Sequence, residues 1–156
     1  MLTLDEILNQ ETDAELTQFN KDDAWRLGNI AHELAGENAK KIGISVKLFN
    51  QHIFYFAGSE TIYDAEFWIR RKRNVVERHN HSSYYISNEY KMDENEYYRH
   101  NAVKPSDFAI HGGGFPIRVK GVGLVGSIVC SGMLSEDDHL LCYHSLKKLQ
   151  EELRNS

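Results

Sequence analysis

The sequence predicts an α+β domain in which an antiparallel sheet packs against helices. Apolar residues alternate with polar or small ones in two pairs of segments, within residues 42–58 and 115–131, as they do in β-hairpins. Helical patterns precede, separate and follow these pairs instead of alternating singly with strands, which favours an antiparallel sheet. The chain of 156 residues is long enough for a single domain, residues 1–156, with a hydrophobic core.

Two helices are expected before the first hairpin. Thr3 and Glu6 have the spacing of a capping box, and Asn20 and Asp23 start a second helix in a similar way. One face of this second helix carries an apolar stripe, formed by Leu27, Ile30, Ala31 and Leu34. Trp25 falls nearly opposite the stripe, where it is either a lone exposed aromatic residue or a subunit contact.

The first hairpin is expected to pair residues 42–49 with residues 52–58, because Asn50 and Gln51 separate two apolar runs. A third helix is predicted next, over residues 64–80, and an irregular polar stretch follows it.

The second hairpin is expected to pair residues 115–120 with residues 124–131 around a glycine-containing turn. Pro116 suits an edge strand or the start of a strand, because proline has no backbone N–H to donate. Ser135, with Asp138 three residues later, is expected to cap a final helix. The apolar face of that helix contains Cys142, Leu146, Leu149 and Leu153.

Composition argues against several classes of protein. The net charge of −5 argues against a general nucleic-acid binder. No apolar run approaches the ~20 residues that span a bilayer, and the first residues lack the features of a signal peptide. We therefore expect a cytoplasmic protein with no membrane partner. Cys130 and Cys142 lack the spacing of a redox or zinc motif, so we expect both to be reduced core residues.

Positive charge is concentrated in the predicted third helix. Between Trp68 and Tyr84 there are five basic residues and one acidic residue, which gives a local charge of +4 in a chain of −5. Such a cluster is either a solvated helix face or an anion-binding patch. Lys72 falls inside the apolar arc of the helix. It either lays its stem along the core with its ammonium at the boundary, or points into a pocket as a ligand contact.

The segment HNHSSYY, residues 79–85, follows this helix. Its letters suggest an HNH nuclease, but that motif is spread over a longer ββα-metal unit. His79 and His81 are two residues apart, which a helix would point in different directions, and no nearby Asp, Glu or Cys completes a usual ligand set, which argues against a metal site. Ser82 and Ser83 instead offer hydroxyl and backbone N–H groups at a helix terminus, a common place for a carboxylate or phosphate.

The segment HGGGFPI, residues 111–117, looks like the oxyanion-hole segment of lipases and esterases. Their chemistry requires a G-x-S-x-G elbow, and no serine in this chain has glycine both two residues before and two residues after it. Gly112, Gly113 and Gly114 are then either a bulge or crossing point in the sheet, or a floor of backbone N–H groups facing a ligand. In the second case His111 stands at the rim of the site.

Three blocks of the sequence carry a family resemblance. A basic stretch from Trp68 to Arg78 is followed by the HSSY block at residues 81–84, and then by the HGG-FPI block at residues 111–117. In this order they resemble an uncharacterised bacterial and fungal protein family, grouped with the GlcG/HbpS-like haem-degrading domain superfamily. The resemblance covers about residues 27–149. Leu134 departs from it, because the family pattern has proline there.

The resemblance implies a profilin-like fold, in which a central antiparallel sheet of about five strands lies between helices. It also implies assembly into dimers or larger rings. Relatives in the superfamily are implicated in binding or degrading haem, and related domains accompany corrinoid and glycolate-utilisation proteins. Those relatives do not share the HSSY and HGG-FPI blocks, so their haem ligands do not transfer. If haem binds here, His81 and His111 are the candidate iron ligands.

We therefore expect a homo-oligomer that binds a small anionic ligand, for which haem or another tetrapyrrole is one candidate. The expected site lies between the basic helix and the glycine segment, and its candidate residues are Lys72, Arg78, His81, Ser82, Ser83, His111, Gly112 and Gly113. Two alternatives stay open. One is an enzyme that uses Lys72 or His81 as general acid or base on a carboxylate substrate. The other is an oligomeric scaffold that acts through Trp25.

Overall fold

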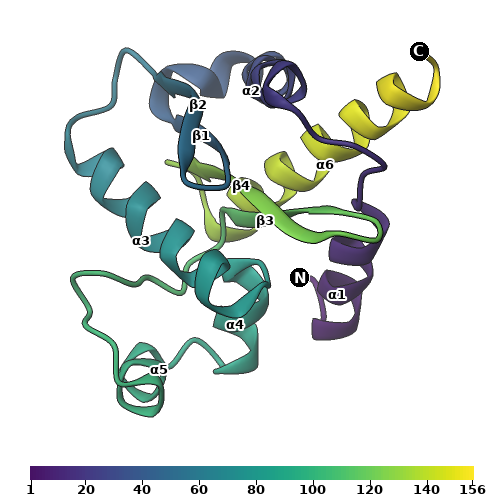
Figure 1. Cartoon of the computed structure of the whole chain (residues 1–156). Coiled ribbons are helices and arrows are strands. Elements are labelled where there is room, and N and C mark those ends of the chain that lie inside the picture. Colours follow the sequence, from purple (N-terminus) through teal and green to yellow (C-terminus); the bar gives the residue numbers. More distant parts are fainter.

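A four-stranded antiparallel sheet in the order β2-β1-β4-β3 organises the fold, seen in a computed structural model that describes residues 1–156 (Figure 1). Strands β1 (Gly43–Leu48) and β2 (Gln51–Ala57) form one hairpin. Strands β3 (Gly114–Val119) and β4 (Gly123–Ser131) form the other, and β1 pairs with β4 to join them. Both predicted hairpins are confirmed, and Pro116 lies on an edge strand as expected.

The family resemblance implied about five strands, and this number was wrong. The position beside β3 is occupied by Leu16, which forms a single parallel bridge to Val119. The N–H of Leu16 donates to the carbonyl of Arg118, and its carbonyl accepts from the N–H of Lys120, each at 2.9 Å. A single bridged residue is too short for a strand, and there is little room to extend it because one helix ends at Asp13 and the next begins at Lys21.

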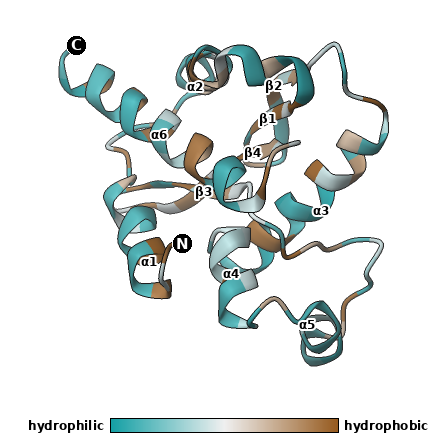
Figure 2. Ribbon diagram, turned by 180° about the vertical axis from the view of Figure 1, so that it is seen from behind, coloured by the Kyte–Doolittle hydropathy of each residue, from teal (hydrophilic) through white to brown (hydrophobic).

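Helices cover both faces of the sheet. Helices α2 (Lys21–Ala35) and α6 (Ser135–Arg154) pack on one face, and α3 (Asp64–His79) packs on the other (Figure 1). The strands alternate accordingly: Ile44 lies in the core with α2 and α6, whereas Ser45 faces α3. In Figure 2 the central strands are largely hydrophobic and the outer turns of α6 are hydrophilic. The α+β arrangement predicted from the patterns therefore has its main core between the sheet and two helices.

Local capping signals were mostly correct. Helix α1 (Leu4–Asp13) begins with the capping box of Thr3 and Glu6, and α2 begins with that of Asn20 and Asp23. The prediction for α6 was wrong, because Leu134 precedes the helix without a side-chain cap and Ser135 is its first residue. A 3-10 helix, η1 (Gly36–Lys41), links α2 to the sheet.

The apolar stripes of the helices are confirmed except at Leu34, and Leu153 of α6 is only half-buried. Leu27, Ile30 and Ala31 are buried, as are the cysteine and two of the leucines predicted for α6. Leu34 is exposed instead, because it lies over polar outer turns of α6. Both cysteines are free and buried, as expected.

Two short helices, α4 (Ser83–Glu89) and α5 (Glu94–Asn101), lie between α3 and β3. They enclose a small second core with α3, formed by Val75, Ile86, Tyr97 and Ile110. Helix α5 stands apart from the sheet (Figure 1) and is hydrophilic on its outside (Figure 2). No helix combines the length and apolar character that a membrane crossing requires.

Candidate functional site

Lys72 lies on the buried side of α3 and is only 4% exposed. Its ammonium contacts Ser131 Oγ at 3.1 Å, the Asp138 carboxylate at 3.4 Å and the carbonyl oxygen of Cys130 at 3.5 Å. The ammonium therefore does not reach the solvent boundary and ends in a buried ion pair. Each of the three N–H donors of the ammonium therefore has an acceptor, and the carbonyl of Cys130 is the most distant of them.

Asp138, in the first turn of α6, is the counter-ion of Lys72. Its buried carboxylate also accepts hydrogen bonds from the backbone N–H groups of Gly132 and Met133. Burial raises the pKa of Asp138, and Lys72 opposes this shift. The ion pair brings no net charge to the site as long as both groups are ionised.

A cleft of about 270 Å³ opens beside this ion pair, and we call it the Lys72 cleft. The ring of His111 meets Trp68 edge-on, with the ring centroids 5.2 Å apart, and the two rings form one wall. His111 Nε2 hydrogen-bonds to the carboxylate of Glu94 in the first turn of α5. The wall is therefore positioned jointly by α3 and α5.

Gly112 and Gly113 pack directly behind the Lys72 cleft. A Cβ on Gly113 would lie 2.1 Å from the carbonyl oxygen of Cys130 and 2.9 Å from Lys72 Nζ. A Cβ on Gly112 would lie 2.1 Å from the carbonyl oxygen of Ser135. These glycines thus form a crossing point of the chain. Their N–H groups make no hydrogen bond within the chain, which leaves two backbone donors unused.

His81 and Ser82 hold a carboxylate, but it belongs to the chain itself. Glu11 of α1 is buried and accepts hydrogen bonds from the backbone N–H and the hydroxyl of Ser82, both at 2.9 Å. Its other carboxylate oxygen lies 2.8 Å from His81 Nδ1 and 2.9 Å from the guanidinium of Arg118. The anion expected at this helix terminus is therefore an internal glutamate that ties α1 to α4.

Arg78 and Ser83 also point away from the Lys72 cleft. Arg78 is exposed and donates to the carbonyl of Asn101 at the end of α5. Ser83 Oγ accepts from the N–H of Gly114 at 2.9 Å. The structure brings Lys72 and His111 to one cleft with two glycines behind them, and it separates the remaining predicted residues from that cleft.

Sequence reasoning missed Asp138 and Ser131 as partners of Lys72. Asp138 matched a capping pattern and Ser131 ended a predicted strand, so neither was selected as a site residue. A lysine on the apolar arc of a helix needs a counter-ion when it is fully buried. A lysine on the apolar face of a helix therefore predicts an acidic partner from elsewhere in the chain, but it does not identify which acidic residue that is.

Comparisons with known proteins agree on one family. Residues 19–147 match the family model described as haem degrading protein HbpS-like. A UPF0303 protein of Psychromonas ingrahamii is 36% identical over 154 residues, which cover 99% of this chain and 97% of that protein. The crystal structure of Ybr137w protein superposes with a TM-score of 0.88 at 28% identity, covering 97% of this chain and 89% of the other.

The fold is shared more widely than the sequence. A crystal structure of a PduOC–haem complex superposes with a TM-score of 0.67 at 14% identity, over 83% of this chain and 93% of the other. At that identity the likeness concerns the fold alone. The match to the family model covers most of the chain, and the similarity to a UPF0303 protein covers almost all of it. Together they establish the family of this chain. The chain belongs to the HbpS-like family and, within it, to the UPF0303 proteins.

Proposed function

We propose that this protein binds a small carboxylate in the Lys72 cleft. The observation that supports the proposal is the meeting of the buried Lys72 ammonium with the rings of His111 and Trp68 at one cleft, in front of the closely packed Gly112 and Gly113. A ligand carboxylate would accept from the Lys72 ammonium, while the rings of Trp68 and His111 would contact the body of the ligand. The small size of the cleft limits the ligand to a few heavy atoms.

Haem fits the residues of one chain poorly. The Lys72 cleft, at about 270 Å³, falls below the ~300–1,000 Å³ usual for pockets that hold drug-sized ligands, and haem needs a large one. The contacts of His111 with Glu94 and of His81 with Glu11 each leave one ring nitrogen free, so it is the size of the cavities, and not these contacts, that opposes haem. His81 borders no cavity of ligand size. A small carboxylate is therefore the ligand that we propose.

Exchange of Lys72 tests the proposal. Lys72→Gln alone would leave Asp138 buried without its counter-ion, so the informative variant combines Lys72→Gln with Asp138→Asn. We expect this variant to bind acetate or lactate at least about tenfold more weakly, because a charge-assisted hydrogen bond is lost. The measurement is a titration followed by the amide NMR signals of Gly112 and Gly113.

Arg78→Gln is the matched control, because Arg78 lies on the same helix but outside the cleft. His111→Gln, at a partly exposed position, tests the opposite wall without disturbing the buried ion pair. Carboxylate affinity that stays unchanged in both cleft variants would exclude the Lys72 cleft. A saturable Soret shift with haemin that His111→Gln abolishes would instead favour a tetrapyrrole.

A further inference from the structure

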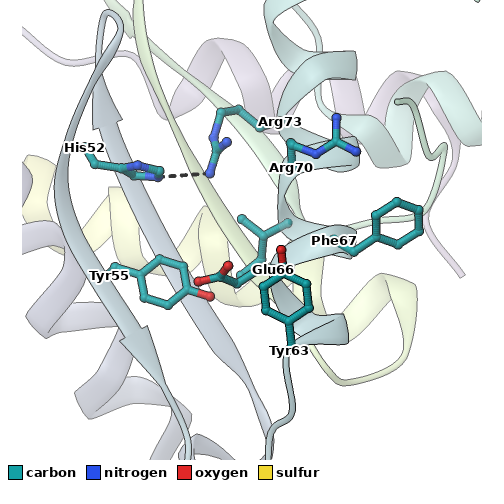
Figure 3. Close-up of a pocket in the computed structure, with 8 residues that line it drawn as sticks. His52, Tyr55, Tyr63, Glu66, Phe67, Arg70 and Arg73 are labelled. Atoms are coloured by element: carbon teal, nitrogen blue, oxygen red, sulfur yellow. Dashed lines mark hydrogen bonds between the residues drawn. The ribbon is translucent and has the colours of Figure 1, made fainter. Parts of the chain in front are cut away.

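A second cavity lies between β2 and α3, and we call it the Arg73 pocket (Figure 3). Its volume is about 470 Å³, within the usual range for ligand pockets. His52 and Tyr55 of β2 line one side, and Glu66, Phe67 and Arg73 of α3 line the other. It shares no lining residue with the Lys72 cleft. A ligand in one cavity would therefore not contact the other.

The guanidinium of Arg73 has no counter-ion. Arg73 is only 8% exposed, and its Nη2 donates to Ser45 Oγ at 3.1 Å and to His52 Nε2 at 3.0 Å. Its Nε is buried without any hydrogen-bond partner. No ion pair of the chain includes Arg73, and Glu77 acts on it only from a greater distance.

An isolated buried cation is unfavourable, and arginine cannot relieve the cost by losing its proton. His52 does not share the charge, because burial and then the positive charge of Arg73 lower the pKa of His52. Its ring is neutral near pH 7 and accepts the hydrogen bond from Arg73. The fold thus holds the unpaired positive charge of Arg73 against a cavity, an arrangement that a bound anion would stabilise.

The other walls of the pocket restrict the kind of anion. Tyr63, which is 83% exposed, and Phe67 offer aromatic surface at the mouth of the pocket. Figure 3 shows the carboxylate of Glu66 beside the hydroxyl of Tyr55. After burial, the negative charge of Glu66 is the next cause that raises the pKa of Tyr55. Arg70 also lines the pocket, but its guanidinium is paired with Asp107. The pocket therefore combines one unpaired positive end at Arg73, one negative wall at Glu66 and an aromatic rim.

We propose that the Arg73 pocket binds a small aromatic monocarboxylate. The carboxylate would accept from the guanidinium of Arg73, whose charge no carboxylate of the chain neutralises. The aromatic ring would lie against Tyr63 and Phe67. Glu66 would repel a second negative charge, so the site would select a monoanion over a dianion. This site is separate from the Lys72 cleft, and neither proposal depends on the other.

Benzoate is the probe that tests this site, with binding measured by calorimetry and by amide NMR shifts. Arg73→Met is expected to weaken benzoate binding about 30-fold or more, because hydrogen bonds to the charged group are lost. The same variant should melt no lower than the wild type, because it removes a buried unpaired charge. Arg78→Gln, and Lys72→Gln combined with Asp138→Asn, should leave benzoate affinity unchanged.

Two further variants test the other walls of the pocket. Both alter side chains that would not donate a hydrogen bond to the ligand carboxylate. Tyr63→Ser, at a strongly exposed position, should weaken benzoate binding even if Arg73→Met fails to fold. Glu66→Gln should improve the binding of phthalate, a dianion, relative to benzoate by about fivefold, because one repulsive charge is gone.

Three results would overturn the proposal. The first is benzoate affinity that Arg73→Met and Tyr63→Ser both leave intact. The second is a set of benzoate-induced shifts at Gly112 and Gly113 in place of Ser45 and Tyr55. The third is dissociation of an oligomer by Arg73→Met together with no benzoate binding to the wild type, which would mean that a second copy of the chain supplies the carboxylate.

Discussion

Burial decides the charge of His139, a residue in the first half of α6. Its side chain is fully buried, and its Nε2 lies 2.7 Å from the side-chain oxygen of Gln10. Its Nδ1 is buried without a partner. Burial lowers the pKa of His139 to about 4, and the opposing effect of Glu136 is smaller. The ring is therefore neutral in the folded protein, whereas the unfolded chain protonates it below about pH 6.5.

This difference predicts a loss of stability in weak acid. The folded pKa lies below the unfolded pKa, so the stabilisation is fully present above about pH 6.5 and is lost as the pH falls toward 4. Between pH 6.5 and pH 5 the free energy of unfolding should fall by about 2 kcal/mol. Urea unfolding at several pH values measures this change in the free energy of unfolding. His139→Gln should remove this slope and the exposed His144→Gln should keep it; an equal slope in both variants would contradict the assignment.

At the scale of elements, α3 directs two consecutive cations to two different cavities. Successive residues of a helix are ~100° apart, so Lys72 reaches the ends of β4 and α6 while Arg73 reaches β1 and β2. The first meets a carboxylate and the second does not. A charge count over the helix predicts a basic patch, whereas the packing neutralises Lys72 with Asp138 and leaves Arg73 without a carboxylate.

The loop before β3 is predicted to tolerate no side chain at Gly113. Its φ is +130°, and a Cβ would lie 2.1 Å from the carbonyl oxygen of Cys130, so Gly113→Ala should cost about 4 kcal/mol through strain and overpacking. Gly121, with φ of +80° and no atom within 4 Å of a Cβ, isolates the conformational part, about 1 kcal/mol. Thermal unfolding compares the two. Equal losses would show that close packing at Gly113 is unimportant.

At the scale of the whole molecule, β2 is an edge strand that leaves one side of the sheet open. Trp25 lies next to this edge with 56% of its surface exposed, and its ring meets Phe54 of β2 edge-on at 5.1 Å between centroids. Exposed aromatic surface beside an open edge is typical of a subunit contact. The two interpretations of Trp25, a lone exposed residue and a subunit contact, therefore predict different masses for a Trp25 variant in solution.

Self-association through this surface predicts a smaller particle for Trp25→Ser. Sedimentation velocity at several concentrations should show a lower mass for the variant, with unchanged helix and strand content by circular dichroism. Leu134→Ser, an exposed apolar residue before α6 and away from β2, is the control and should keep the mass of the wild type. Equal masses for all three proteins would identify Trp25 as a lone exposed aromatic residue.

Local rules account for the elements that the sequence predicted correctly. Capping at Thr3 and Asn20 depends on residues three positions apart, and the hairpins depend on alternation over a few residues, so both can be read along the chain. The site could be predicted only in part. The structure brings Lys72 and His111 to one cleft near the glycines, as the order of the blocks suggested. The position of Arg73 against β1 and β2 depends on strand packing that no local pattern contains.

The sequence by itself determined the α+β class, both hairpins, the helix starts at Thr3 and Asn20, and the concentration of positive charge on α3. Tertiary structure alone decided which of those charges are neutralised. Lys72 meets Asp138 across 66 residues of chain, and Glu11 meets Ser82 across 71. The physical reason is that the energy of a buried charge depends on its neighbours in space, which a chain brings together only when its core packs.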